Sequence, residues 1–287
     1  MIIADFNGIA LGAIITQKLD IQEDIIRHII LNSLRMYNKK FRDEYGQMVI
    51  ACDHSSWRKK VFPQYKFKRK ESREGDEEKT EYWNEVFRIL NMVRDEIREN
   101  LPYKVIHIEG CEADDIIGTL ALETQEFNKG EPVMILSADK DFVQLHRFNN
   151  VRQYSPMQKK FVQEPNPRMY MFEHLMKGDS GDGVPNVLSP DNTFTDGIRQ
   201  SPVTKKKIEN WLENVDKLEE VMDTETYRNY RRNKMLIDLE ETPAELKESI
   251  INTYENTKAA PKMKVLNYLI KKRCKQLIEC VEEFYPK

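Results

Sequence analysis

Short β-type runs alternate with long helical segments through the first half of this 287-residue chain, and this alternation constrains the fold more than any other feature. Strand-like apolar runs occupy residues 2–6, 48–52, 104–108 and 132–136. Apolar residues recur at helical spacing in segments 22–45, 81–100 and 112–128. Alternation of this kind predicts an α/β fold with a central, mostly parallel sheet, right-handed crossovers and helices on both faces.

The second part of the chain, from about residue 168, shows only helical periodicity. Helices are predicted around residues 208–212, 227–239, 244–254 and 265–284. Residues 185–202 carry several Pro, Asn and Ser and are predicted to be irregular. The sequence therefore predicts two domains, an α/β domain over residues 1–170 and a smaller all-helical domain over residues 171–287.

A dense run of basic residues lies within the α/β part. Residues 57–73 contain Arg58, Lys59, Lys60, Lys66, Lys68, Arg69, Lys70 and Arg73 against a single acidic residue, Glu71. An acid-rich stretch follows at 74–81. Because so many charges cannot be buried together, residues 57–80 are predicted to form an exposed loop or arch.

Acidic residues follow each of the four predicted strands. They are Asp5 after the first, Asp53 after the second, Glu112, Asp114 and Asp115 after the third, and Asp139 and Asp141 after the fourth. The carboxyl ends of parallel strands meet at one sheet edge, where ligands bind. Like charges ~4 Å apart repel by about 4 kcal/mol at an effective dielectric of about 20, so a cation must compensate them. Oxygen ligands favour Mg²⁺ or Mn²⁺, and two such ions about 4 Å apart catalyse displacement at phosphorus.

A single Asp after a strand is more often a turn or helix N-cap residue than a metal ligand. Four acidic groups at successive strand ends favour metal binding instead. Asp115 is expected to be structural, because adjacent helical residues point about 100° apart and cannot all face one metal.

Charge and cysteine content exclude several classes of protein. A net charge of -3 excludes a simple polycation that binds nucleic acid through its overall charge. The four cysteines form no C-x-x-C pair, which argues against a disulfide framework and against a cysteine zinc site. No stretch approaches about 20 apolar residues and the apolar N-terminus lacks a basic start, so a soluble cytoplasmic protein without membrane contact is predicted.

Six motifs stand in order along the chain. They are I-I-A-D-F at 2–6, A-C-D at 51–53, F-P-Q-Y-K-F-K-R at 62–69, E-A-D-D at 112–115, S-A-D-K-D-F-V-Q-L at 137–145 and G-D-S-G-D-G-V-P at 178–185. In this order they resemble the 5′ nucleases, the family of flap endonucleases and of the 5′-exonuclease domains of bacterial DNA polymerases. The resemblance covers most of the chain and is strongest to the ribonucleases H of T-even bacteriophages, especially at residues 154–162. It implies the family's PIN-like nuclease core and a helix-three-turn-helix in the helical domain.

The resemblance implies two divalent cations, Mg²⁺ with Mn²⁺ as a substitute, that activate water and stabilise charge on the phosphate. The residues implied around the first ion are Asp5, Asp53, Glu112, Asp114 and Asp139. Those implied around the second, partly through water, are Asp141, Asp179 and Asp182.

The motif at 62–69 resembles the family's basic-aromatic motif. By this resemblance a base stacks on Tyr65, while Lys66 and Arg69 hold the scissile phosphate and are the catalytic cations. Further nucleic-acid contacts are expected from Arg58, Lys59, Lys60 and Lys68. For Lys59, Lys60 and Lys68, a phosphate contact and a solvated loop remain equally open.

The motif at 178–185 resembles the opening of the helix-three-turn-helix, whose backbone N–H groups grip duplex phosphates, here at Gly181 and Gly183. It departs from the family where Gly183 replaces a common Asn and where the insertion 188–202 follows. The next predicted helix opens with Lys205, Lys206 and Lys207, for which duplex contacts and a solvated helix end both remain open.

The implied activity is that of a Mg²⁺-dependent 5′ to 3′ exonuclease and flap endonuclease with ribonuclease H activity on RNA-DNA and DNA-DNA duplexes. Its implied task is primer removal in phage lagging-strand replication, as a monomer in the host cytoplasm. The family's partners, a sliding clamp and a single-stranded-DNA-binding protein, stay open. One alternative is a phosphatase of the haloacid dehalogenase type, which needs a second Asp where Asn7 stands. The other, a non-catalytic junction-binding protein, is disfavoured because every matched acidic position is present.

Overall fold

A computed structural model describes residues 1–17, 21–73, 76–125 and 130–286. The predicted helix at 112–128 and the predicted arch at 57–80 both extend into residues outside this set. By their contacts the residues form two packing units, each described by itself below. The sheet unit comprises Met1–Ser55, Glu81–Gln163 and Ala244–Lys287, and the helical unit comprises Ser56–Thr80 and Glu164–Pro243.

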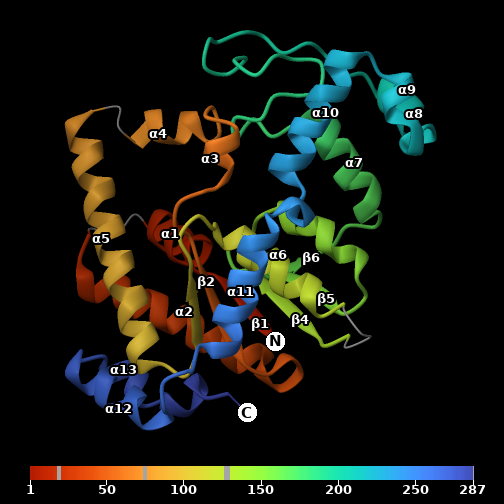
Figure 1. The fold of residues 1–287 in the computed structure, drawn as a ribbon. Coiled ribbons are helices and arrows are strands. Elements are labelled where there is room, and N and C mark those ends of the chain that lie inside the picture. The colour runs from red at the N-terminus through yellow and green to blue at the C-terminus, as the bar shows by residue number, and fades with distance from the viewer. Residues whose placement is uncertain (18–20, 74–75, 126–129, 287) are drawn as a thin grey trace. The chain divides into compact units, whose positions relative to one another are not determined.

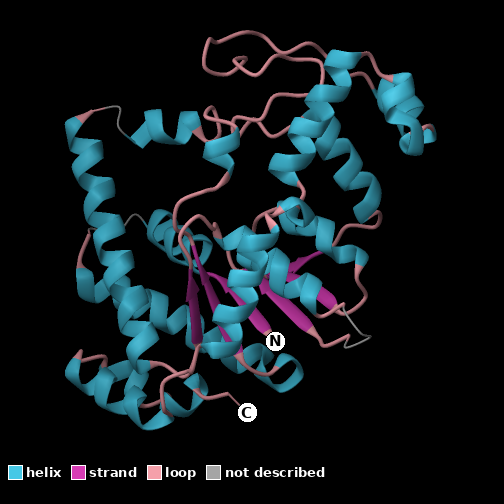
Figure 2. Cartoon of the chain, in the orientation of Figure 1, coloured by secondary structure: helices cyan, strands magenta, loops and turns pink. Residues whose placement is uncertain are grey.

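The sheet unit is built on one six-stranded sheet (Figure 2). Its strands are β1 (Ile2–Asp5), β2 (Met48–Cys52), β3 (Lys104–His107), β4 (Val133–Leu136), β5 (Val151–Ser155) and β6 (Lys160–Val162). They lie in the order β3-β2-β1-β4-β5-β6, and all neighbours are parallel except β5 and β6. The predicted mostly parallel sheet is therefore confirmed, and the four predicted strands lie within one residue of β1 to β4.

Helices cover both faces of this sheet, as predicted (Figure 1). Alternate strand residues such as Ile2, Ala4 and Ile50 pack in one core with α1 (Phe6–Gln17), α2 (Glu23–Tyr45) and α5 (Glu77–Asn100). On the other face, α6 (Ala113–Glu123) contacts β1, β2 and α11 (Ala244–Asn256), and α11 contacts β3. Each fully buried aliphatic side chain stabilises such a core by about 1.5–3 kcal/mol.

The last segment of the chain packs into the sheet unit. It forms α12 (Lys262–Lys271), α13 (Lys275–Ile278) and the 3-10 helix η5 (Val281–Phe284). Val265, Leu269 and Phe284 from these elements are buried in the core that α2 and α5 share. The packing units are thus not contiguous in sequence. The division at residue 170 into a nuclease domain and a duplex-binding domain stays a prediction.

Two small apolar clusters lie among the described residues of the helical unit. Its elements are α3 (Arg58–Val61), α4 (Phe67–Arg73), α7 (Pro167–Lys177), α8 (Lys205–Glu213), η3 (Val215–Lys217), α9 (Leu218–Val221), α10 (Thr224–Ile237) and η4 (Leu239–Glu241). Residues 185–202 form turns without helix or strand, as predicted. The buried Arg232 on α10 holds the start of this excursion by donating to the carbonyls of Pro185 and Asn186.

Four local features differ from what the sequence predicts. The basic segment is largely helical, in α3 and α4, and α5 begins at Glu77 rather than at residue 81. Arg58 is buried, because its Nε donates to the Leu236 carbonyl oxygen at 2.8 Å and its guanidinium lies 4.8 Å from the centre of the Trp57 ring. Helix α1 has no polar face and hence no helical periodicity to predict it from. None of the described helices is both long and apolar enough to cross a bilayer.

Candidate active site

Four neighbouring parallel strands carry the predicted acidic residues to one sheet edge. Asp5 is the last residue of β1, Asp53 directly follows β2, Glu112 precedes α6 after β3, and Asp139 follows β4. Because β3, β2, β1 and β4 are adjacent and parallel, their carboxyl ends lie side by side. The charges of Asp53 and Asp139 both reach Asp5, so these three carboxylates form one electrostatic group. We refer to Asp5, Asp53 and Asp139, with Glu112 and Asp114, as the carboxylate edge.

Asp5 is buried at the start of α1. Its Oδ1 accepts the backbone N–H of Gly8 at 2.8 Å, and its Oδ2 accepts the Ser137 hydroxyl at 2.9 Å. A Cβ at position 8 would lie 2.3 Å from Oδ2, so only glycine leaves room for this carboxylate. Burial, followed by the charge of Asp53, raises the pKa of Asp5 to about 7 despite these hydrogen bonds.

Asp53 is fixed by donors from two elements. Its Oδ2 accepts the Asn7 side-chain amide, and its Oδ1 accepts the backbone N–H of Ala113, both at 2.7 Å. Ala113 is the first residue of α6, so this bond ties Asp53 to the helix start where Glu112 is the N-cap and Asp114 lies in the first turn. This positioning role of Asn7 was not predicted, because nothing in the sequence shows that Asn7 and Asp53 meet.

Glu112 and Asp115 form a capping box at the start of α6. The backbone N–H of Glu112 donates to Asp115 Oδ2 at 2.9 Å, and the Glu112 side chain accepts from the backbone of Asp115. Asp115 is fully buried, which agrees with its expected structural role. Asp114, between them, is half-buried.

The fourth acidic group lies in the turn after β4. The backbone N–H of Asp139 donates to Ser137 Oγ at 3.1 Å, and the backbone N–H of Asp141 donates to Asp139 Oδ1 at 3.0 Å. The Asp139 side chain is exposed, whereas Asp141 is half-buried and begins the 3-10 helix η2 (Asp141–Arg147). Ser137 thus links Asp139 to Asp5 through one hydroxyl.

The donor set of the carboxylate edge fits a divalent cation. Within the described residues, neither Asp5, Asp53 nor Asp139 forms an ion pair with Lys or Arg, so their mutual repulsion is uncompensated by the chain. Every donor is a carboxylate oxygen, which is the ligand type of Mg²⁺ and Mn²⁺. Asp5, Asp53 and Asp139 are the residues that would hold such an ion, with Glu112 and Asp114 beside them.

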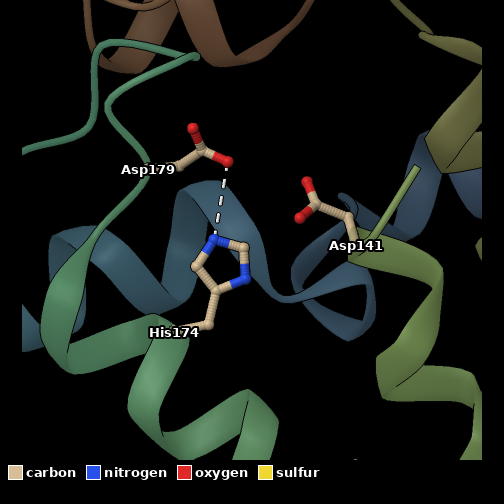
Figure 3. Close-up of side chains that lie close together, drawn as sticks. All are labelled: Asp141, His174 and Asp179. Carbon is tan, nitrogen blue, oxygen red and sulfur yellow. Dashed lines mark ion pairs between the residues drawn. The ribbon is translucent and has the colours of Figure 1, made fainter. Parts of the chain in front are cut away.

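A second acidic group lies in the helical unit, in the turn after α7. Asp179 Oδ1 accepts the backbone N–H groups of Gly181 at 2.7 Å and of Asp182 at 3.0 Å. His174 Nε2 lies 3.5 Å from Asp179 Oδ2, as the dashed line in Figure 3 marks. The bond to His174, then the backbone bonds, lowers the pKa of Asp179 to about 2. His174 is a further residue that the sequence analysis missed.

Asp182 joins this turn to the basic motif. Its buried carboxylate accepts the Tyr65 hydroxyl at 2.9 Å, lies 3.4 Å from Lys66 Nζ and forms a short ion pair with Arg69. The backbone N–H of Lys66 donates to the Asp182 carbonyl oxygen at 2.7 Å. Burial raises the pKa of Asp182, while Lys66 and then Arg69 act against that rise. The two motifs, at 62–69 and 178–185, therefore form one hydrogen-bonded structure.

Two sequence expectations for these motifs need correction. Tyr65 is 4% exposed and packs against Leu175, Val184 and Ile237, so its ring offers no face for a base to stack on. Gly183 is also buried, with φ of 75°, and a Cβ there would lie 2.9 Å from the Gln64 carbonyl oxygen. Glycine is required at 183 by this close approach within the protein, rather than by an open phosphate site.

The remaining predicted nucleic-acid contacts are mostly on the surface of the helical unit. Exposed side chains or backbone are found at Lys59, Lys60, Lys68, Arg69, Gly181, Lys205, Lys206 and Lys207. Lys68 Nζ lies 4.8 Å from the centre of the Phe194 ring. The three lysines form the first turn of α8, whose N-cap Thr204 accepts the backbone N–H of Lys207.

Comparisons with known proteins agree with this architecture. Residues 13–172 match the family described as 5′-3′ exonuclease, N-terminal resolvase-like domain, and residues 165–284 match T4 RNase H, C terminal. The chain is 33% identical over 294 residues to the ribonuclease H of Enterobacteria phage T4, which covers 98% of this chain and 94% of that protein.

Solved structures share the fold at lower identity. The T5 5′-exonuclease with bound zinc ions has a TM-score of 0.59 at 16% identity, covering 90% of this chain and 99% of that one. The bacteriophage T5 flap endonuclease, in a pseudo-enzyme-product complex with DNA and metal ions, has a TM-score of 0.59 at 17% identity and covers 98% of both chains.

Proposed function

This chain belongs to the 5′-3′ exonuclease family and is a metal-dependent 5′ nuclease, and from this premise we propose its reaction, substrate and cellular task. It hydrolyses phosphodiesters near the 5′ ends of RNA-DNA and DNA-DNA duplexes, as an exonuclease and as a flap endonuclease, and it uses Mg²⁺. The observation that carries the proposal is the carboxylate edge, where neighbouring parallel strands bring Asp5, Asp53 and Asp139 to one side of the sheet and the charges of Asp53 and Asp139 act on Asp5.

The carboxylate edge is the proposed site of the first ion. A divalent cation bound there supplies positive charge that activates water and stabilises negative charge developing on the phosphate. The chain's own contribution is to hold the ligands still: Gly8 and Ser137 orient Asp5, and Asn7 and the start of α6 orient Asp53. The residues proposed for the second ion are Asp141, Asp179 and Asp182.

Lys66 and Arg69 are the proposed ligands of the scissile phosphate. Both already pair with a carboxylate, that of Asp182: Arg69 through a short ion pair and Lys66 with its Nζ at 3.4 Å. A bound phosphate would replace the Asp182 carboxylate as the acceptor for Lys66 and Arg69. Asp182 could then ligate a cation, so its ion pairs with the basic motif are compatible with a role at the second ion. Tyr65 contributes its hydroxyl to this group and not its ring face.

Duplex binding is proposed for the exposed basic surface of the helical unit. Exposed positive charge suited to phosphates is carried by Lys59, Lys60, Lys68 and the lysines that open α8. The proposed task is RNA primer removal in lagging-strand replication, in the cytoplasm of a phage-infected cell, by a monomer. This is supported by the likeness to the phage T4 ribonuclease H over nearly the whole chain.

One digestion experiment tests the proposed reaction. A 5′-labelled DNA flap and a 5′-labelled RNA-DNA hybrid are incubated with the protein in Mg²⁺, in Mn²⁺ and in EDTA. The proposal expects short 5′ products from both substrates with either ion, and intact substrates in EDTA. Release of products from the 3′ end, or equal cleavage in EDTA, would contradict it.

Lys66→Ala is expected to weaken cleavage and to flatten its salt dependence. Loss of one phosphate contact lowers the slope of log K against log salt by about one unit. The measurement is duplex affinity and single-turnover rate between low and moderate salt. Lys271→Ala, at the exposed end of α12, is the matched control and should leave the slope unchanged. An unaltered slope for Lys66→Ala would mean that Lys66 contacts no phosphate and serves only its ion pair with Asp182.

A further inference from the structure

Gln153 is a polar residue in the middle of the sheet. It lies on β5, opposite Ile135 of β4 and Val162 of β6, and its side chain is completely buried. An amide buried without partners costs about 1–3 kcal/mol, whereas an apolar side chain at this position would stabilise the sheet. The hydrogen bonds that the buried Gln153 side chain makes must therefore explain why a polar residue stands here.

Both polar atoms of the Gln153 side-chain amide have hydrogen-bond partners. Its Nε2 donates to the carbonyl oxygen of Ser137 at 3.0 Å and to that of Asp139 at 2.6 Å. These two acceptors fix the orientation of the amide, so its Oε1 must accept, and His146 Nε2 lies 2.9 Å from it. One side chain thus binds the backbone on both sides of residue 138, in the turn that presents Asp139.

This turn determines how two carboxylates of the edge lie relative to each other. The Ser137 hydroxyl donates to Asp5 Oδ2 and accepts the backbone N–H of Asp139. A shift of the backbone between 137 and 139 therefore moves Asp139 and also moves the hydroxyl that donates to Asp5. Gln153 restrains that backbone from the neighbouring strand, and it does so without contact to a carboxylate.

We infer that Gln153 is a positioning residue that holds the turn 137–139 in the shape required for cation binding at the carboxylate edge. The inference deepens the proposed function and rests on it. Residues behind metal ligands commonly change metal affinity by about 10–100-fold when they are removed. Their effect is distinct from a loss of stability, because it appears in the affinity of the folded protein for the ion.

The test measures Mn²⁺ affinity of the folded protein by isothermal titration calorimetry, with no nucleic acid present. Gln153→Met keeps the length of the side chain and removes its amide, and we expect Mn²⁺ to bind about tenfold more weakly. Gln125→Met is the control, since Gln125 Nε2 also donates to Ala121, Thr124 and Asn150, near the start of β4. It should lose comparable stability and keep the wild-type Mn²⁺ affinity.

Two further variants separate the possible outcomes. Asp139→Asn must weaken Mn²⁺ binding, because otherwise the ion is not at the carboxylate edge and the proposed function fails rather than this inference. His146→Leu removes the partner of Gln153 Oε1, and a smaller loss of Mn²⁺ affinity is expected. If Gln153→Met does not fold, the Mn²⁺ affinity of His146→Leu tests the inference in its place. Wild-type Mn²⁺ affinity in every folded variant of Gln153 and His146 would overturn the inference.

Discussion

Asp139→Asn is expected to reduce the rate of phosphodiester cleavage by about a thousandfold while the fold and duplex binding persist. The substitution removes one negative charge from the carboxylate edge and with it several kcal/mol of cation-mediated stabilisation, at about tenfold in rate per 1.36 kcal/mol. The fold should be insensitive, because the Asp139 side chain is exposed and an asparagine oxygen can still accept the Asp141 N–H.

Single-turnover digestion of a 5′-labelled flap in Mg²⁺ measures this effect, with duplex affinity in EDTA measured alongside. Asp216→Asn, an exposed aspartate on η3, is the matched control and should cleave at the wild-type rate. Unchanged turnover for Asp139→Asn would remove Asp139 from the catalytic group. A parallel loss of duplex affinity would instead indicate damage to the fold.

Asp5→Asn is expected to stabilise the cation-free protein while it abolishes cleavage. The pKa of Asp5 is raised from 3.8 to about 7 in the folded protein. Between those values the folded state binds more protons than the unfolded state, so the free energy of unfolding falls as pH rises from about 4 to about 7. Above pH 7 the full penalty of the buried charge remains, of the order of 4 kcal/mol at 1.36 kcal/mol per pKa unit.

Thermal unfolding in EDTA at pH 8 and at pH 5 tests this expectation. Asp5→Asn should unfold at a higher temperature than wild type at pH 8, and the difference should shrink at pH 5. Mn²⁺ should raise the unfolding temperature of the wild type and have little effect on the variant, because binding to the folded state alone stabilises it. If Asp5→Asn unfolds at or below the wild-type temperature at pH 8, the pKa of Asp5 is not raised in the folded protein.

The carboxylate edge could be predicted from sequence because it depends only on local pattern and one rule of topology. Short, continuous apolar runs located β1 to β4, and parallel pairing then required their acidic ends to share an edge. Strand β5 was missed because Arg152 and Gln153 interrupt its apolar pattern. For the same reason nothing in the sequence connects Gln153 to Asp139, since their contact depends on the pairing of β4 with β5.

For the basic motif at 62–69, the residues could be predicted from the sequence but their surroundings could not. These surroundings come from a segment more than a hundred positions away. The buried ring of Tyr65 and the buried guanidinium of Arg58 follow from packing against α7 and the end of α10. Charge density along the sequence could not reveal that apolar neighbours and free carbonyl oxygens would be available there.

Residues 62–69 and 178–183 depend on each other, because Gly183 fits closely against Gln64 and Asp182 bonds to Lys66. Neither segment can be exchanged for that of a relative by itself, since a side chain at 183 or a different backbone at 64–66 would separate the pair. A chimera that borrows residues 62–69 must borrow 178–183 with them. Among relatives, the two segments should change together.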